Sequence, residues 1–118
     1  MKNKIEIIDD VVVVTLKGKL MGGPEIEECY QKIKNATAQG MNKAAVDMSA
    51  AEWINSRGMG MLMACYVSLK NQGGELRLSG ETEKTKGLLK MMKLNTIFKS
   101  YESIDEAVDS FRHSPPTQ

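Results

Sequence analysis

The sequence contains few of the residues on which enzymes and metal proteins commonly depend. It has one histidine, His113, and two cysteines, Cys29 and Cys65, which lack the spacing of a zinc site or a redox pair. We therefore expect no metal, no cofactor and two reduced thiols packed in the interior. Aromatic residues make up only 5% of the chain, and the nine methionines fill volume that aromatic rings would otherwise occupy.

The chain also lacks a strong charge bias and a long hydrophobic run. Sixteen Lys and Arg against fifteen Asp and Glu give a formal charge of +1, which argues against a general DNA- or RNA-binding protein. The richest apolar segment, residues 59–67, is roughly half as long as a membrane span, and the first residues do not resemble a secretory signal. We expect a cytoplasmic protein without direct nucleic-acid binding or membrane insertion.

The 118 residues are enough for one domain with its own core and too few for two. Hydrophobic periodicity and turn residues predict the order β-β-α-β-α-β-α-β-α, an α/β fold with a mixed, mostly parallel sheet, an N-terminal hairpin and four helices. Residues 1–111 form the expected domain and residues 112–118 a frayed tail. The expected strands cover residues 4–8, 11–16, 43–48, 75–79 and 97–101.

Turn and cap residues place the ends of these elements. Asp9-Asp10 suits the hairpin turn, Gly18 is expected to end the second strand, and Pro24 opens the first helix. A short loop over residues 51–55 is expected to lead into the second helix. Thr82 is expected to cap the third helix, with Leu88, Leu89 and Met92 inward, and the capping box 103–106 opens the last, with Ile104, Ala107, Val108 and Phe111 inward.

Two catalytic or ligand-binding interpretations of residues 54–60 find little support. A nucleophile elbow needs a glycine two residues before the serine, where Ile54 stands, and His113 lies in the expected tail, so the sequence argues against a hydrolase and against an enzyme generally. Gly58 and Gly60 could cradle the phosphate of a nucleotide, but a Walker lysine-serine pair is missing. Close packing of the helix on the sheet is the preferred explanation of these glycines.

Ser56, at the expected start of the second helix, has two possible roles. Its hydroxyl, or the side chain of Asn55, suits an N-cap that accepts a hydrogen bond from the first helical turn. Alternatively, Ser56 is a regulatory phosphorylation site, where a phosphate would meet the positive end of the helix dipole. The methionine-rich residues 59–67 that follow suit either the core or an exposed contact surface, and core is the commoner case.

The region 47–66 resembles the signature of STAS domains, the fold of bacterial anti-sigma factor antagonists. The resemblance extends from about Ile5 to Phe111. In that family a buried strand is followed by a D-S-S/T-G-L-G motif, and here the strand ends Val46-Asp47-Met48 and the motif is Asn55-Ser56-Arg57-Gly58-Met59-Gly60. Residues 72–76 and 92–98 also resemble the corresponding parts of the family pattern.

The resemblance implies a binding module of a partner-switching circuit. Such an antagonist binds an anti-sigma factor that is also a serine kinase, which ends the interaction by phosphorylating the motif serine, here Ser56, and a metal-dependent serine phosphatase resets it. The implied docking surface contains Met21, Asn55, Ser56, Arg57, Gly58 and Met59.

Three positions depart from the family pattern. Asn55 and Met21 stand where the family has aspartates, and Arg57 replaces a serine or threonine. The docking site thereby becomes basic and apolar, which motivates an alternative: a constitutive, unphosphorylated STAS subunit, such as a stressosome-type scaffold or a regulator of a transporter ATPase. A nucleotide sensor of the same fold is a third possibility.

Overall fold

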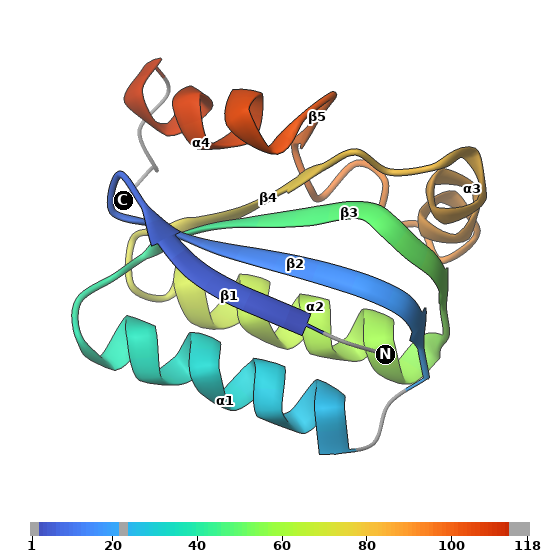
Figure 1. The fold of residues 1–118 in the computed structure, drawn as a ribbon, viewed down its shortest axis with the longest axis horizontal. Helices are drawn as coiled ribbons and strands as arrows, with labels where there is room; N and C mark the ends of the chain where they lie inside the picture. Colours follow the sequence, from blue (N-terminus) through green and yellow to red (C-terminus); the bar gives the residue numbers. More distant parts are fainter. Residues whose placement is uncertain (1–2, 22–23, 114–118) are drawn as a thin grey trace.

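The computed structural model describes residues 3–21 and 24–113. Within these ranges the chain forms one mixed sheet with helices on both faces, which confirms the expected α/β class and element order (Figure 1). Gly22-Gly23, which precede the first helix, lie outside the described residues. The elements are β1 (Asn3–Ile8), β2 (Val11–Leu20), α1 (Pro24–Ala38), β3 (Lys43–Ile54), α2 (Ser56–Lys70), β4 (Glu75–Ser79), α3 (Glu83–Met91), β5 (Ser100–Tyr101) and α4 (Ile104–His113).

The strands lie in the order β1-β2-β3-β4-β5, with β1 antiparallel to β2 and the other neighbours parallel. The antiparallel pair is the expected hairpin. Asp9 and Asp10 have φ angles of 51° and 66°, the left-handed pair of a two-residue type I′ turn. Helices α1 and α2 cover one face of the sheet, α4 covers part of the other, and α3 lies beside the far end of β3 (Figure 1).

The hydrophobic core divides into two parts because successive residues of β2 point to opposite faces. Val12 and Val14 contribute to the large cluster beneath α1 and α2, which also includes residues of α3 and Phe98. Val11 and Val13 belong to a smaller cluster beneath α4. Beyond Val13, the α4 side of β2 is no longer deeply buried, so the helix protects only one end of that face.

Strands β2 and β3 are longer than predicted, so the expected strand end at Gly18 and the expected loop over residues 51–55 are wrong. The two strands remain paired to Leu20 and Ile54. Gly18, with φ 76°, lies between two register shifts, so this glycine forms a bulge inside the strand and does not end it. Burial of Ala51 and Ile54 stabilises the extension.

The expected strand over residues 97–101 is wrong in its first half. Only Ser100 and Tyr101 pair with β4, because Phe98 turns into the core, where its ring centre lies 5.4 Å from that of Tyr66 in an edge-to-face contact.

The predictions for the last two helices are largely confirmed. Thr82 caps α3, and Leu89 is buried, but Met92 is exposed because the helix ends before it. Helix α4 continues through His113, past the expected start of the tail at residue 112. The Arg112 side chain pairs with Asp9 of the hairpin, which stabilises the last turn; residues 114–118 lie outside the described ranges.

Candidate functional site

Ser56 is the first residue of α2, and its neighbour Asn55 is the N-cap. The Asn55 Oδ1 accepts a hydrogen bond from the Gly58 amide at 3.0 Å. Of the two roles left open by the sequence, capping therefore belongs to Asn55. The Ser56 side chain is exposed, so its hydroxyl stands at the surface of the molecule.

The first turn of α2 leaves two backbone amides available. The Asn55 amide donates to the Leu20 carbonyl at 3.0 Å, the Gly58 amide is capped, and the Met59 amide makes the first helical bond, to the Asn55 carbonyl. Within the described parts of the chain, the amides of Ser56 and Arg57 have no acceptor. The first turn contains no acidic residue, so the positive end of the helix is not neutralised locally.

Asn55 also ties the start of α2 to the end of β2. Its Nδ2 donates to the Met21 carbonyl at 2.9 Å. The Met21 side chain is 52% exposed. The structure therefore brings Met21, Asn55 and Ser56 together at one end of the molecule, as the resemblance implied.

Two of the expected docking residues lie below the surface. Gly58 and Met59 are buried, and Met59 belongs to the large core cluster. A Cβ on Gly58 would lie 2.7 Å from Ile54 Cγ1 and 2.8 Å from the Leu20 carbonyl oxygen. Glycine at this position thus permits close packing of α2 on the strand ends, which confirms the preferred explanation for Gly58. A Cβ on Gly60 would meet nothing within 4 Å, so the same explanation is wrong for Gly60. Gly58 and Met59 therefore lie beneath the exposed residues of the expected docking surface.

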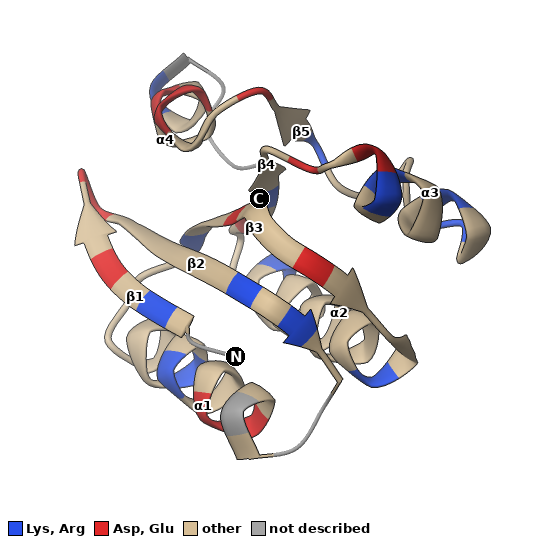
Figure 2. Cartoon of the chain, turned by 45° about the vertical axis from the view of Figure 1, so that its right-hand side comes forward, with Lys and Arg blue, Asp and Glu red and all other residues tan. Residues whose placement is uncertain are grey.

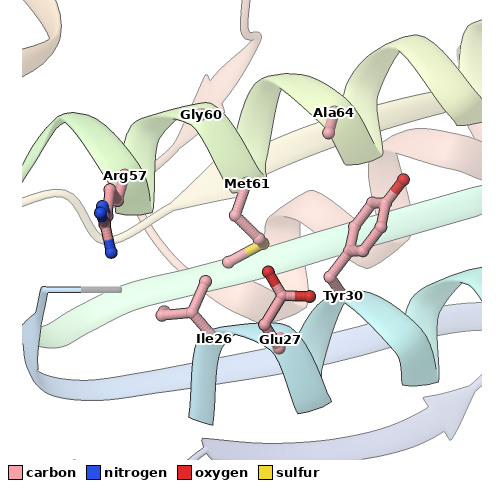
Figure 3. A pocket seen from close by; sticks show the side chains of 7 residues that line it. All are labelled: Ile26, Glu27, Tyr30, Arg57, Gly60, Met61 and Ala64. Atoms are coloured by element: carbon pink, nitrogen blue, oxygen red, sulfur yellow. The ribbon is translucent and has the colours of Figure 1, made fainter. Parts of the chain in front are cut away.

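Arg57 stands at one end of a groove between α1 and α2. The groove has a volume of about 430 Å³ and is lined by Ile26, Glu27, Tyr30, Arg57, Gly60, Met61 and Ala64. Figure 3 shows Met61 projecting from α2 toward Ile26 and Glu27 of α1. Among the described residues, no carboxylate lies within ion-pair distance of Arg57, and the residue is exposed, so its charge is open to solvent.

The methionine-rich part of α2 is mainly core. Met59, Met61 and Cys65 are buried, whereas Met63 is half-buried. Both cysteines are free and buried, which confirms the expected packed thiols. Burial raises the pKa of Cys29 to about 11 and that of Cys65 to about 12, so both thiols stay protonated at neutral pH.

Within residues 3–21 and 24–113, none of the helices is long and apolar enough to cross a membrane. The same ranges contain no group of three or more His, Cys, Asp or Glu side chains that could hold a metal ion.

Sequence reasoning missed one exposed residue near this site. Trp53, the only tryptophan of the sequence, lies two residues before the N-cap Asn55 and is 38% exposed. It stands on β3, in the segment 51–55 that was expected to be a loop. The only available signal was a lone tryptophan between Glu52 and Ile54, because the exposure of Trp53 depends on a strand pairing that the sequence did not reveal.

Over 109 residues, covering 91% of this chain and 95% of the relative, the chain is 28% identical to a protein of Thermotoga maritima assigned as an anti-sigma factor antagonist. A crystal structure of such a protein from the same organism superposes with a TM-score of 0.84 at 26% identity, covering 93% of this chain and 94% of that one.

The anti-sigma factor antagonist SpoIIAA in its unphosphorylated form gives the same TM-score, 0.84, at 19% identity, covering 95% of this chain and 97% of that one. The phosphorylated form of SpoIIAA from Bacillus gives 0.78 at 20% identity, with coverage of 94% and 100%. At these identities SpoIIAA supports the fold alone. Residues 2–107 match the STAS domain family, and the chain therefore belongs to that family.

Proposed function

We propose that this protein is an anti-sigma factor antagonist that binds an anti-sigma factor through Met21, Asn55, Ser56 and Arg57. We propose further that the anti-sigma factor is a serine kinase, that phosphorylation of Ser56 ends the interaction, and that a serine phosphatase reverses it in the cytoplasm. The observation that carries the proposal is the exposed Ser56 hydroxyl, which the capping of α2 by Asn55 leaves unused.

The surroundings of Ser56 suit an added phosphate. Transfer of a phosphoryl group from ATP to the Ser56 oxygen would place nearly two negative charges beside the open amides of the first turn and the Arg57 side chain. These groups stabilise the anion locally, and the buried residues beneath, Gly58 and Met59, need not move. The phosphate would therefore change the charge of the docking surface without unfolding it, which is how a phosphorylation switch releases a partner.

The test is binding to a purified serine-kinase anti-sigma factor encoded in the same genome. We expect Ser56→Ala to bind like the unmodified protein and Ser56→Asp to lose binding by about a hundredfold or more. Thr96→Asp is the matched control, because Thr96 is also exposed but lies on the connection between α3 and β5. Incubation with the kinase and ATP should add one phosphate, which fragment masses place on Ser56. Wild-type binding by Ser56→Asp would refute the switch.

A second candidate function is a constitutive interaction subunit that is never phosphorylated. It is favoured by the exposed Arg57 and Met21, which give a basic and apolar surface where the family has acidic residues. Intact-mass measurement of the protein from its native cells separates the two. Phosphate on Ser56 in any growth condition supports the switch, and a wholly unmodified protein through growth and stress supports the constitutive subunit.

A further inference from the structure

Beyond α4, the outer face of β2 and β3 is exposed at Lys17, Lys19 and Trp53. The lysines of β2, blue in Figure 2, lie on this stretch. Lys19 pairs in register with Trp53 of β3, and both side chains are exposed, while their neighbours Leu20 and Ile54 point into the core. The long strands thus carry a polar and aromatic surface up to the start of α2.

A shallow hollow of about 420 Å³ occupies this end of the sheet, lined by Lys19, Met21, Glu52, Trp53 and Lys84. Lys84, from α3, holds its ammonium 5.7 Å from the centre of the Trp53 ring. Met21 and Trp53 are two of the large hydrophobic side chains exposed in the described structure. Tryptophan gains much of its binding energy when a partner removes its remaining water contact, so Trp53 is placed as an anchor.

The charge of the hollow is positive. Lys70 and Lys99 each pair with Glu75, whereas Lys19 and Lys84 have no carboxylate within ion-pair distance among the described residues. Glu52 is the single acidic residue that lines the hollow. Two cations without ion-pair partners against one carboxylate favour a negatively charged occupant.

We propose that this hollow binds an acidic segment of a partner protein that carries one large apolar side chain. The apolar side chain packs on Trp53 and Met21, and flanking carboxylates approach Lys19 and Lys84. The hollow adjoins the proposed docking surface at Met21, and the inference rests on the proposed function, because it specifies the chemistry of the partner that this surface selects. A protein segment fits better than a nucleic acid, since Glu52 and Met21 would oppose a phosphate backbone.

Trp53 supplies the readout, because its fluorescence is the only tryptophan signal of the chain. The probe is a short synthetic peptide of alternating Asp and Glu with one central Leu, titrated into the full-length protein. The control peptide has Asn and Gln in place of the acids. We expect the acidic peptide to shift Trp53 fluorescence and to bind at least about tenfold more tightly than the amide peptide at low salt, with the difference shrinking as salt is raised.

Variants test the assigned contacts. The double variant Lys19→Gln, Lys84→Gln should bind the acidic peptide about tenfold more weakly than the unmodified protein does. The matched control Lys32→Gln, Lys90→Gln removes two exposed charges of α1 and α3 that do not line the hollow. Thermal unfolding of each variant checks that the fold is intact. Equal weakening by both double variants, or equal affinity for both peptides, would overturn the inference. So would tighter binding of an oligothymidylate or of phosphatidylserine vesicles than of the acidic peptide.

The same variants separate this inference from the switch. If Ser56→Asp abolishes binding of the anti-sigma factor and the Lys19, Lys84 variant binds it normally, the inference fails and the proposed function stands. If the acidic peptide binds as expected and Ser56 is never phosphorylated, the proposed phosphorylation switch is wrong and the inference about the hollow is supported.

Discussion

Asn55 donates a hydrogen bond from Nδ2 to the main-chain carbonyl of Met21, across 34 positions of sequence. The same side chain accepts the Gly58 amide through Oδ1, so one amide group both caps α2 and holds the end of β2 against it. The position of Ser56 relative to Met21 depends on this double contact.

Asn55→Ala should therefore destabilise the protein by about 1–2 kcal/mol, because the cap is lost. Asn55→Asp keeps an acceptor for the Gly58 amide and loses only the donor to Met21, so its cost should be smaller. Urea unfolding of both variants measures how much stability comes from the cap and how much from the hydrogen bond to Met21. An aspartate variant as unstable as the alanine variant would show that the link to Met21, and not the cap, is the stabilising contact.

Substitutions of Ser56 should have little effect on stability. The side chain is exposed and does not cap the helix, so Ser56→Ala should change the free energy of unfolding by less than about 0.5 kcal/mol. Ser56→Asp places a negative charge at the positive end of α2 and should be neutral or more stable by up to about 1 kcal/mol. Chemical denaturation at low salt checks both values, and a loss above about 1 kcal/mol for either variant would contradict the exposed, non-capping position.

The two glycines of the motif should respond oppositely to alanine. Gly58→Ala would push a Cβ to within 2.8 Å of the Leu20 carbonyl oxygen and should destabilise by about 2 kcal/mol or more. A Cβ on Gly60 meets nothing within 4 Å, so Gly60→Ala should be neutral or stabilise by up to about 1 kcal/mol through helix propensity. Thermal unfolding of the pair gives the comparison directly, and similar losses would mean that α2 can shift away from the strands.

Arg77 is completely buried beneath α4 and should be important for stability. Its guanidinium carbon lies 4.2 Å from the ring centre of Phe111, and its Nη1 donates to the Ser110 hydroxyl at 2.8 Å. Its Nε also lies 3.5 Å from Oε1 of the buried Glu75. Removing Arg77 leaves Glu75 buried with fewer partners, so Arg77→Ala should cost about 3 kcal/mol or more. Lys99→Ala removes an exposed partner of Glu75 and should cost less than about 1 kcal/mol. If urea unfolding gave the same loss of stability for Arg77→Ala and Lys99→Ala, the buried contacts of Arg77 would be no more important than the exposed ion pair of Lys99.

The buried thiols predict a loss of stability at high pH. Burial raises the pKa of Cys29 to about 11 and that of Cys65 to about 12, from an ordinary value of 9.0. Because the unfolded chain releases these protons first, their contribution is fully present below pH 9 and is lost as the pH rises toward 12. The Cys29→Ala, Cys65→Ala variant should show a flatter decline over this window in urea unfolding. An unchanged slope would mean that other groups cause the decline.

The sequence predicted the hairpin and the α3 cap because short-range chemistry decides both. Asp9 and Asp10 adopt the left-handed angles of a two-residue turn, and the Thr82 hydroxyl accepts a hydrogen bond from the Thr85 amide three residues ahead. The sequence could not decide between Asn55 and Ser56 as the α2 cap, because both residue types cap well. The choice depends on a hydrogen bond from the Asn55 amide to Leu20, which only the packing of β2 against the helix start supplies.

The remaining errors have the same origin. Gly18 has the appearance of a strand end in sequence, and only its pairing with Ala51 of β3 shows that it is a bulge. The sequence predicted a strand over residues 75–79 but not the burial of its Arg77, which α4 covers. Exposure of Trp53 likewise depends on the extension of β3. Each of these features is fixed by a segment distant in sequence, which local patterns do not encode.

The unequal edges of the sheet limit how copies of this protein can associate. β1 forms one edge and offers six residues, whereas β5 forms the other with only two. A fibre that grows strand by strand needs two competent edges on every molecule, while a pair joined β1 to β1 consumes the long edge of both copies. Association through the sheet would therefore stop at two molecules, and the short edge protects the fold from open-ended polymerisation.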